Sequence, residues 1–191
     1  MTLIPTTESV SIYFYKFIVN HQVFFKSKYT YALVNLKPIV PGHVLIVPLR
    51  TNVIRLSDLT PIESIDYMNT LQLIHRFIID HYKADSLNIA IQDGPESGQS
   101  IPHLHTHIIP RYKLDGIDDG IHNQIESMDL IKQFEQRKQS FLTAKEKGLL
   151  LKVPHDNDRI SRTDEVMKVE ADGLREKLNN FIKQNDIVID Q

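Results

Sequence analysis

The chain has 191 residues, of which 41% are hydrophobic and 24% charged, and its formal net charge is −2 at pH 7. This length and composition suit one soluble domain with a tail or an insertion. A charge so close to zero excludes recruitment of nucleic acid or an acidic membrane by bulk electrostatics. The absence of cysteine excludes disulfides, thiol nucleophiles and thiolate metal sites.

No apolar run reaches the length of about 18 residues that a membrane-spanning helix needs. Residues 1–10 lack the basic-then-apolar pattern of a secretory signal. We therefore expect a cytoplasmic protein with no membrane partner, and a share in the nucleus stays open.

Two strands are predicted near the start of the chain. Residues 28–36 alternate aromatic or aliphatic with smaller side chains, which is typical of a strand covered on both faces. After a turn at Pro41-Gly42, residues 43–49 indicate a second, buried strand. Only a few residues join the two, so we expect an antiparallel pair, because a parallel pair needs a long crossover.

A helix is predicted next, from Pro61 to about Tyr82. Thr60 is a suitable N-cap, Pro61 suits the first helical position, and Glu63 completes a capping box. The apolar residues that lie close to one face of this helix are Ile65, Met68, Leu71, Ile74 and Ile78.

The rest of the chain divides into three parts. Residues 87–91 alternate apolar and polar side chains, which predicts another strand and closes a domain core that we assign to residues 1–112. Residues 113–160 are polar and poorly patterned, so we expect a mobile or disordered insertion. Residues 161–191 predict a C-terminal helix that packs on the core, although Gly173 weakens it locally.

Three alternating histidines, His103, His105 and His107, are the strongest functional signal. In a strand, residues two apart share a face, so the three imidazoles would form a row. Such a row can bind zinc with an open water position, or it can use imidazole itself in catalysis. Chance clustering on an exposed strand is a third interpretation, and no carboxylate that would orient zinc ligands is obvious nearby.

The segment from Gln92 to Ser100 precedes the histidines and is rich in glycine and in side-chain donors. Glycines let backbone N–H groups approach an anion closely. Alone, the segment predicts only a turn. Directly before three histidines, it favours a phosphate cradle beside a nucleophile.

The chain resembles the histidine-triad family in four stretches. These are residues 32–45, 48–50, 92–100 and 102–111. His103 to Ile109 match the family motif of three histidines alternating with usually apolar residues, although Thr106 is polar. Within the family the chain looks most like the fungal members of the fragile-histidine-triad branch, which carry a longer insertion before the last helix. Residues 162–175 look like that helix.

The resemblance implies an α+β fold, with an antiparallel sheet of about five strands, one main helix and a C-terminal helix. It also implies a homodimer with a sheet continuous across the interface. The implied activity is hydrolysis of dinucleoside polyphosphates, chiefly diadenosine triphosphate to AMP and ADP, through a covalent nucleotidyl-histidine. No cofactor and no metal ligand are implied, although Mg²⁺ or Mn²⁺ could accompany the polyphosphate.

The resemblance also implies roles for individual residues. His105 would be the nucleophile, His107 would assist the leaving group, and His103 would orient the row with His43 behind it. Asn35 would bind the ribose. The remaining substrate contacts would come from Gln92, Gly98, Gln99, Ser100, Ile101 and His107. Without the resemblance, His43, Asn35 and Gln92 would be interpreted as structural residues at strand ends.

One position departs from the branch. A gapless count back from Asn35 places Lys16 where animal members have a histidine at the nucleotide pocket, so that contact is altered here. Three alternative functions stay open: a purine-nucleoside phosphoramidase of the same family, a nucleotide-binding signalling module with incidental turnover, and a zinc-dependent hydrolase.

Overall fold

The computed structural model describes residues 10–113, 115, 120–126, 129–132, 135 and 161–189. Most of the predicted insertion, residues 113–160, therefore lies outside the described residues. In the part of the chain that is described, no helix has the length and hydropathy to cross a membrane.

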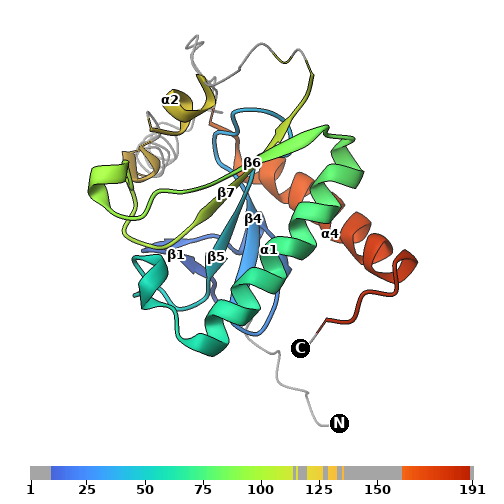
Figure 1. Ribbon diagram of the computed structural model, residues 1–191, viewed down its shortest axis with the longest axis horizontal. Coiled ribbons are helices and arrows are strands. Elements are labelled where there is room, and N and C mark those ends of the chain that lie inside the picture. Colours follow the sequence, from blue (N-terminus) through green and yellow to red (C-terminus); the bar gives the residue numbers. More distant parts are fainter. Residues whose placement is uncertain are drawn as a thin grey trace, which may run out of the picture.

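A five-stranded antiparallel sheet forms the centre of the molecule, with strand order β3-β4-β5-β7-β6 (Figure 1). Its strands are β3 (Val23–Lys26), β4 (Thr30–Val34), β5 (Val44–Pro48), β6 (Ser86–Ile91) and β7 (Thr106–Arg111). A separate hairpin consists of β1 (Tyr13–Phe14) and β2 (Phe17–Ile18). The predicted antiparallel pair is confirmed by β4 and β5, in which every residue is buried. Together with the helices, the sheet confirms the α+β fold.

Helix α1 (Pro61–Tyr82) begins and ends where the sequence predicts. Thr60 is its N-cap and shares a capping box with Glu63, and Lys83 ends it in the left-handed conformation with φ of 53°. The buried side of the helix differs from the predicted face. Ile65 and Met68 are 63% and 51% exposed, because the first half of α1 turns Glu63 and a tyrosine, Tyr67, toward the sheet.

Both α1 and α4 (Asp164–Gln184) cover the same face of the sheet. The rings of Phe77 and Phe181 join the two helices, with centroids 5.9 Å apart. Figure 1 shows α1 crossing in front of β4 and β5, with α4 beside it. The Tyr67 hydroxyl lies 2.7 Å from Thr106 Oγ1 on β7, so the even-numbered residues of β7 face α1.

The opposite face carries smaller elements. Helix α2 (Gly120–Glu126) packs Ile121 and Ile125 against Ile109 of β7. The β1–β2 hairpin is held by the Tyr31 hydroxyl, which donates to the carbonyl of Tyr13 at 2.9 Å. Odd-numbered residues of β7 point to this side, so His107 faces the same side of the sheet as these elements.

Candidate active site

The predicted histidine strand is wrong for its first half. Strand β7 begins only at Thr106, and residues 101–105 are irregular. The ladder with β5 ends there because the Leu104 N–H donates instead to the carbonyl of Val53, at 2.8 Å. The three imidazoles still gather, since all three are buried and the His105 and His107 ring centroids are 5.1 Å apart.

His105 is held in one tautomer by the backbone of His103. Its Nδ1 lies 2.8 Å from the carbonyl oxygen of His103. A carbonyl can only accept, so Nδ1 carries the hydrogen and Nε2 keeps its lone pair. That Nε2 is buried and has no hydrogen-bond partner among the described residues. Burial lowers the pKa of His105 to about 4, so the ring is neutral at pH 7.

His107 adopts the opposite tautomer through a relay from His43. The Ile39 N–H donates to His43 Nδ1 at 3.1 Å, so His43 carries its hydrogen on Nε2. That Nε2 lies 2.9 Å from His107 Nδ1. His107 therefore accepts at Nδ1 and carries its N–H at Nε2. Burial, followed by the neighbouring His105 and His43, lowers the pKa of His107 well below its usual value.

His103 is fixed from the β1–β2 hairpin. The Tyr15 N–H donates to His103 Nδ1 at 3.0 Å. The Phe14 ring packs against both His103 and His105, with centroids 5.7 and 5.4 Å apart. Burial is the main cause that lowers the pKa of His103 to about 4. Sequence reasoning missed Phe14 and Tyr15, because no motif or spacing relates them to residues 88 positions further on.

Asn35 is fully buried and joins the histidine row through His43. Its Nδ2 lies 3.2 Å from His43 Nε2, and because both nitrogens carry hydrogen this is a packing contact rather than a hydrogen bond. Its Oδ1 accepts from the Lys37 N–H at 3.1 Å. The carbonyl of Asn35 accepts from the guanidinium of Arg162, which precedes α4. Arg162 is a second contact that the sequence pattern did not reveal, since it comes from 127 residues away.

The predicted phosphate-binding residues fall into two groups. Gln92 and Gly98 are in contact: a Cβ added at Gly98, where φ is +85°, would lie 2.6 Å from Gln92 Nε2. Gln99 and Ser100 are bonded elsewhere, since Gln99 Nε2 donates to the carbonyl of Ile54 at 2.8 Å and Ser100 Oγ accepts a backbone N–H. Ile101, the last predicted substrate contact, is fully buried.

The family model for the HIT domain matches residues 17–114, just over half of the chain. The chain belongs to the HIT family. The resemblance seen in the sequence is thereby confirmed, and the histidine row is the feature after which this family of proteins is named.

Sequence relatives of this HIT protein include enzymes of two yeasts. It is 51% identical over 195 aligned positions to the bis(5'-adenosyl)-triphosphatase of Saccharomyces cerevisiae, with 91% of this chain and 95% of the relative covered. It is 40% identical over 173 positions to the asymmetrical bis(5'-nucleosyl)-tetraphosphatase of Schizosaccharomyces pombe, with 86% and 92% covered.

Solved structures share the fold of this HIT protein. The diadenosine triphosphate hydrolase of Plasmodium falciparum, crystallised with cyclomarin A, superposes with a TM-score of 0.63 at 25% identity, covering 93% of this chain and 90% of that one. The NitFhit protein of Caenorhabditis elegans gives a TM-score of 0.60 at 26% identity, covering 90% of this chain and 31% of that one.

Two residues that follow β7 in the sequence, Leu130 and Glu135, contact residues near the histidine row. Leu130, which is buried, donates its backbone N–H to Ser100 Oγ at 3.0 Å. Lys16 Nζ, next to the hairpin residue that binds His103, forms an ion pair of 2.9 Å with Glu135. The position where animal members have a histidine is thus occupied here by a cation that already has a carboxylate partner.

Proposed function

We propose that this HIT protein hydrolyses dinucleoside polyphosphates, diadenosine triphosphate in preference to the tetraphosphate, and releases AMP. The observation that carries the proposal is the unpartnered Nε2 lone pair of His105, which the carbonyl of His103 holds in the nucleophilic tautomer. The higher identity to a triphosphatase, 51% against 40% to a tetraphosphatase, supports the order of substrates.

In the first step, His105 Nε2 attacks the α-phosphorus and the bond from that phosphorus to the bridging oxygen breaks. ADP leaves as an anion, and the His107 Nε2–H donates a hydrogen bond to the departing oxygen. The phosphorylated His105 ring becomes an imidazolium. Its charge is stabilised by the Nδ1–H bond to the carbonyl of His103.

In the second step, water attacks the same phosphorus and the phosphorus–nitrogen bond breaks. Its electron pair returns to His105 Nε2, one proton of the water stays on the new phosphate hydroxyl, and the other leaves to solvent. Splitting the displacement in this way gives two easier steps in place of one difficult step. Gln92 and the backbone at Gly98 would hold the phosphate oxygens, and Asn35 the ribose.

The chemistry requires no cofactor, since imidazole supplies the nucleophile and protein N–H groups supply the charge stabilisation. Mg²⁺ or Mn²⁺ would act only by binding the polyphosphate. A strong chelator should therefore leave most of the activity, whereas a zinc-dependent hydrolase would lose all of it.

The test is a chromatographic time course on diadenosine triphosphate, with and without EDTA, comparing wild type with His105→Ala. Equimolar AMP and ADP are expected from wild type only, together with a denaturation-stable nucleotidyl protein in a rapid quench. If wild type binds the dinucleotide but yields no product with any divalent ion, the proposal of an enzyme is wrong and the protein is a binding module.

We also propose that a second copy of this chain docks on α1 and β6. Among the described residues, strand β6 pairs with β7 alone and forms an edge of the sheet, with which another strand can pair. Beside it, Met68, Leu71 and Ile89 line one apolar depression. The first turns of α1 add Ile62 and Ile65, which are 55% and 63% exposed.

Light scattering after size exclusion tests this assembly. Ile65→Asp should convert a dimer into a monomer, because the dimer would bury the new carboxylate. Val169→Asp is the matched control, since Val169 is 73% exposed on α4. A monomeric wild type, or a dimer that survives Ile65→Asp, would exclude this interface.

A further inference from the structure

The loop between β5 and α1, residues 49–60, contacts the histidine segment between His103 and His105. The carbonyl of Val53 accepts the N–H of Leu104 at 2.8 Å. Leu104 lies between the proposed nucleophile and His103, whose carbonyl sets the tautomer. Val53 is itself fully buried, so this hydrogen bond anchors the backbone between the two histidines.

The same loop also holds the segment before the histidines. The carbonyl of Ile54 accepts from Gln99 Nε2 at 2.8 Å, and the Leu56 N–H donates to Asp93 Oδ1 at 2.8 Å. Three nearby loop residues thus contact both ends of the proposed phosphate segment and the histidine row. A shift of the loop would move all of these groups together.

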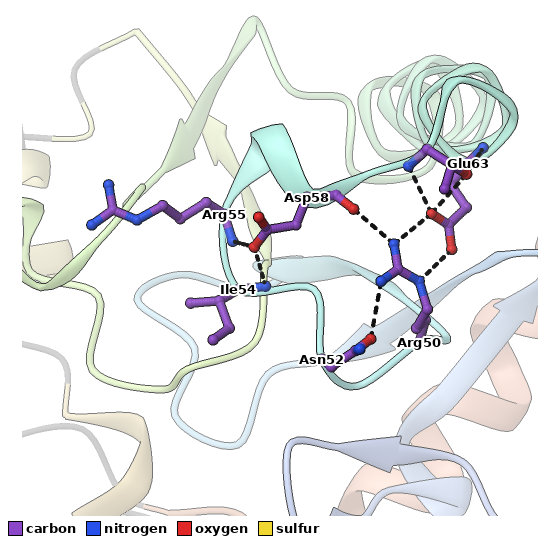
Figure 2. Close-up of polar contacts among 7 residues, drawn as sticks. Arg50, Asn52, Ile54, Arg55, Asp58 and Glu63 are labelled. Carbon is purple, nitrogen blue, oxygen red and sulfur yellow. Dashed lines mark hydrogen bonds and ion pairs between the residues drawn. The ribbon is translucent and has the colours of Figure 1, made fainter.

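Arg50 contacts this loop and the start of α1, as Figure 2 shows. The guanidinium makes a bidentate pair with Glu63 at the start of α1, with distances of 2.8 Å from Nε and 2.7 Å from Nη2. Nη1 donates to Asn52 Oδ1 at 3.0 Å, and Nη2 also donates to the carbonyl of Asp58 at 2.7 Å. One side chain therefore joins the two ends of the loop to the helix.

Both anchors of the guanidinium are themselves held. Glu63 is only 9% exposed and accepts further bonds from the backbone and hydroxyl of Thr60. The carboxylate of Asp58 accepts the N–H groups of Ile54 and Arg55 at 3.0 and 2.8 Å. Ile54 is the residue whose carbonyl receives Gln99, so the hydrogen bonds run continuously from Arg50 to the site.

We propose that Arg50 is a positioning residue for the proposed hydrolysis: its guanidinium fixes the β5–α1 loop, and the loop holds His105 in line with the α-phosphorus. The proposal rests on the proposed function. Lysine cannot replace Arg50 fully, because a single ammonium lacks the planar fork that meets Glu63 and two loop acceptors at once. A displacement of about 1 Å at a reacting atom can cost roughly 100-fold in rate.

The first experiment measures kcat and KM for Arg50→Ala and Arg50→Lys. Arg50→Ala should lower kcat by about 100-fold and Arg50→Lys by about 10-fold, with KM changed by less than about 3-fold. Arg175→Ala is the matched control: Arg175 is 46% exposed against 38% for Arg50, and it also pairs with a carboxylate and a backbone carbonyl. A loss no greater than that of the control would overturn the proposal.

The second experiment needs no turnover. Hydrogen exchange at the Leu104 amide should be faster by about 10-fold or more in Arg50→Ala than in wild type, under conditions where both are folded, with amides of β4 unchanged. Equal Leu104 exchange would refute the positioning role. An inactive wild type would instead defeat the proposed function, while the exchange result still decides whether Arg50 holds the loop.

Discussion

At the scale of single residues, four chemically identical side chains differ in the group that meets the Nδ1 atom of each. A carbonyl meets Nδ1 of His105, whereas N–H donors meet Nδ1 of His103 and of His43. The acceptor forces a lone pair onto Nε2 of His105, and the relay through His43 forces a hydrogen onto Nε2 of His107. Backbone groups rather than residue type therefore distinguish the proposed nucleophile, His105, from the proposed donor, His107.

The low pKa of His105 predicts the acid limb of the pH profile. Only the neutral ring can attack, and burial lowers this pKa to about 4. The value of kcat/KM should thus stay flat as pH falls from 7 to about 5, and then decline toward a slope of one per pH unit below about 4. Stopped-flow pH jumps measure it before the protein unfolds. An acid limb centred near 6.5, the ordinary histidine value, would contradict this burial effect.

Gly98 predicts a second effect at the residue scale. Gly98→Ala should lower kcat/KM by about 10-fold or more, because the new methyl would meet Gln92 Nε2 at 2.6 Å and because φ of +85° is strained for alanine. Gly173→Ala is the control, since nothing lies within 4 Å of the added carbon in α4 and it should gain about 1 kcal/mol of stability. Equal kinetics of both variants with wild type would argue against a role for Gln92.

The site could be predicted from the sequence only in part. The alternating spacing of the three histidines is itself the signal, whereas Asn35 and His43 follow only from the family resemblance. The groups that orient them could not be predicted: the N–H of Tyr15, the carbonyl of Val53 and the guanidinium of Arg162 act through space. A backbone group carries no residue-specific signal, so any amino acid at that position could provide it.

At the scale of secondary structure, the end of an element could be predicted where neighbouring residues in the sequence determine it. It could not be predicted where a contact with a distant part of the chain determines it. The start of α1 is determined by a capping box that spans only four residues, so Thr60 and Glu63 predict it from the sequence alone. The start of β7 depends on whether residues 103–105 bond to β5 or to the loop before α1, and the alternation of side chains cannot distinguish these. The buried face of α1 was missed for the same reason, since Glu63 is buried by a distant arginine.

The N-cap of α1 gives the prediction at this scale. Thr60→Ala should lower the free energy of unfolding by about 1 kcal/mol, because the Glu63 N–H and carboxylate both lose the hydroxyl. Urea denaturation measures the change. Thr51→Ala, at an exposed position of the same loop, should change it by less than about 0.5 kcal/mol. If Thr60→Ala lowered the free energy of unfolding as little as Thr51→Ala, the Arg50–Glu63 ion pair alone would stabilise the start of the helix.

At the scale of the whole molecule, burying several neutral imidazoles ties the stability of the fold to pH. The pKa values of His103 and His105 are lowered to about 4, and that of His107 lies well below its usual value. In the unfolded chain all three titrate near 6.5. Between these limits the unfolded state binds more protons, so stability is greatest above pH 6.5 and falls as pH decreases toward 4.

A second loss of folding stability, caused by a carboxylate, should follow at lower pH. The Arg50 guanidinium lowers the pKa of Glu63 to about 2. The stability that this pair contributes is present above the ordinary glutamate value of about 4.3 and is lost as pH falls toward 2. The two groups of residues therefore destabilise the protein in consecutive windows, histidines first and Glu63 afterwards.

The histidine window can be tested by the slope of stability against pH. Each buried neutral histidine should contribute up to about 1.4 kcal/mol per pH unit between pH 6.5 and 4.5. Replacing one of them, as in His105→Asn, should lower that slope by one such increment. Urea denaturation at half-unit pH intervals gives the slopes. The same slope for wild type and His105→Asn would show that this ring is not buried in its neutral form, and the nucleophile would then have to be activated by a neighbouring base.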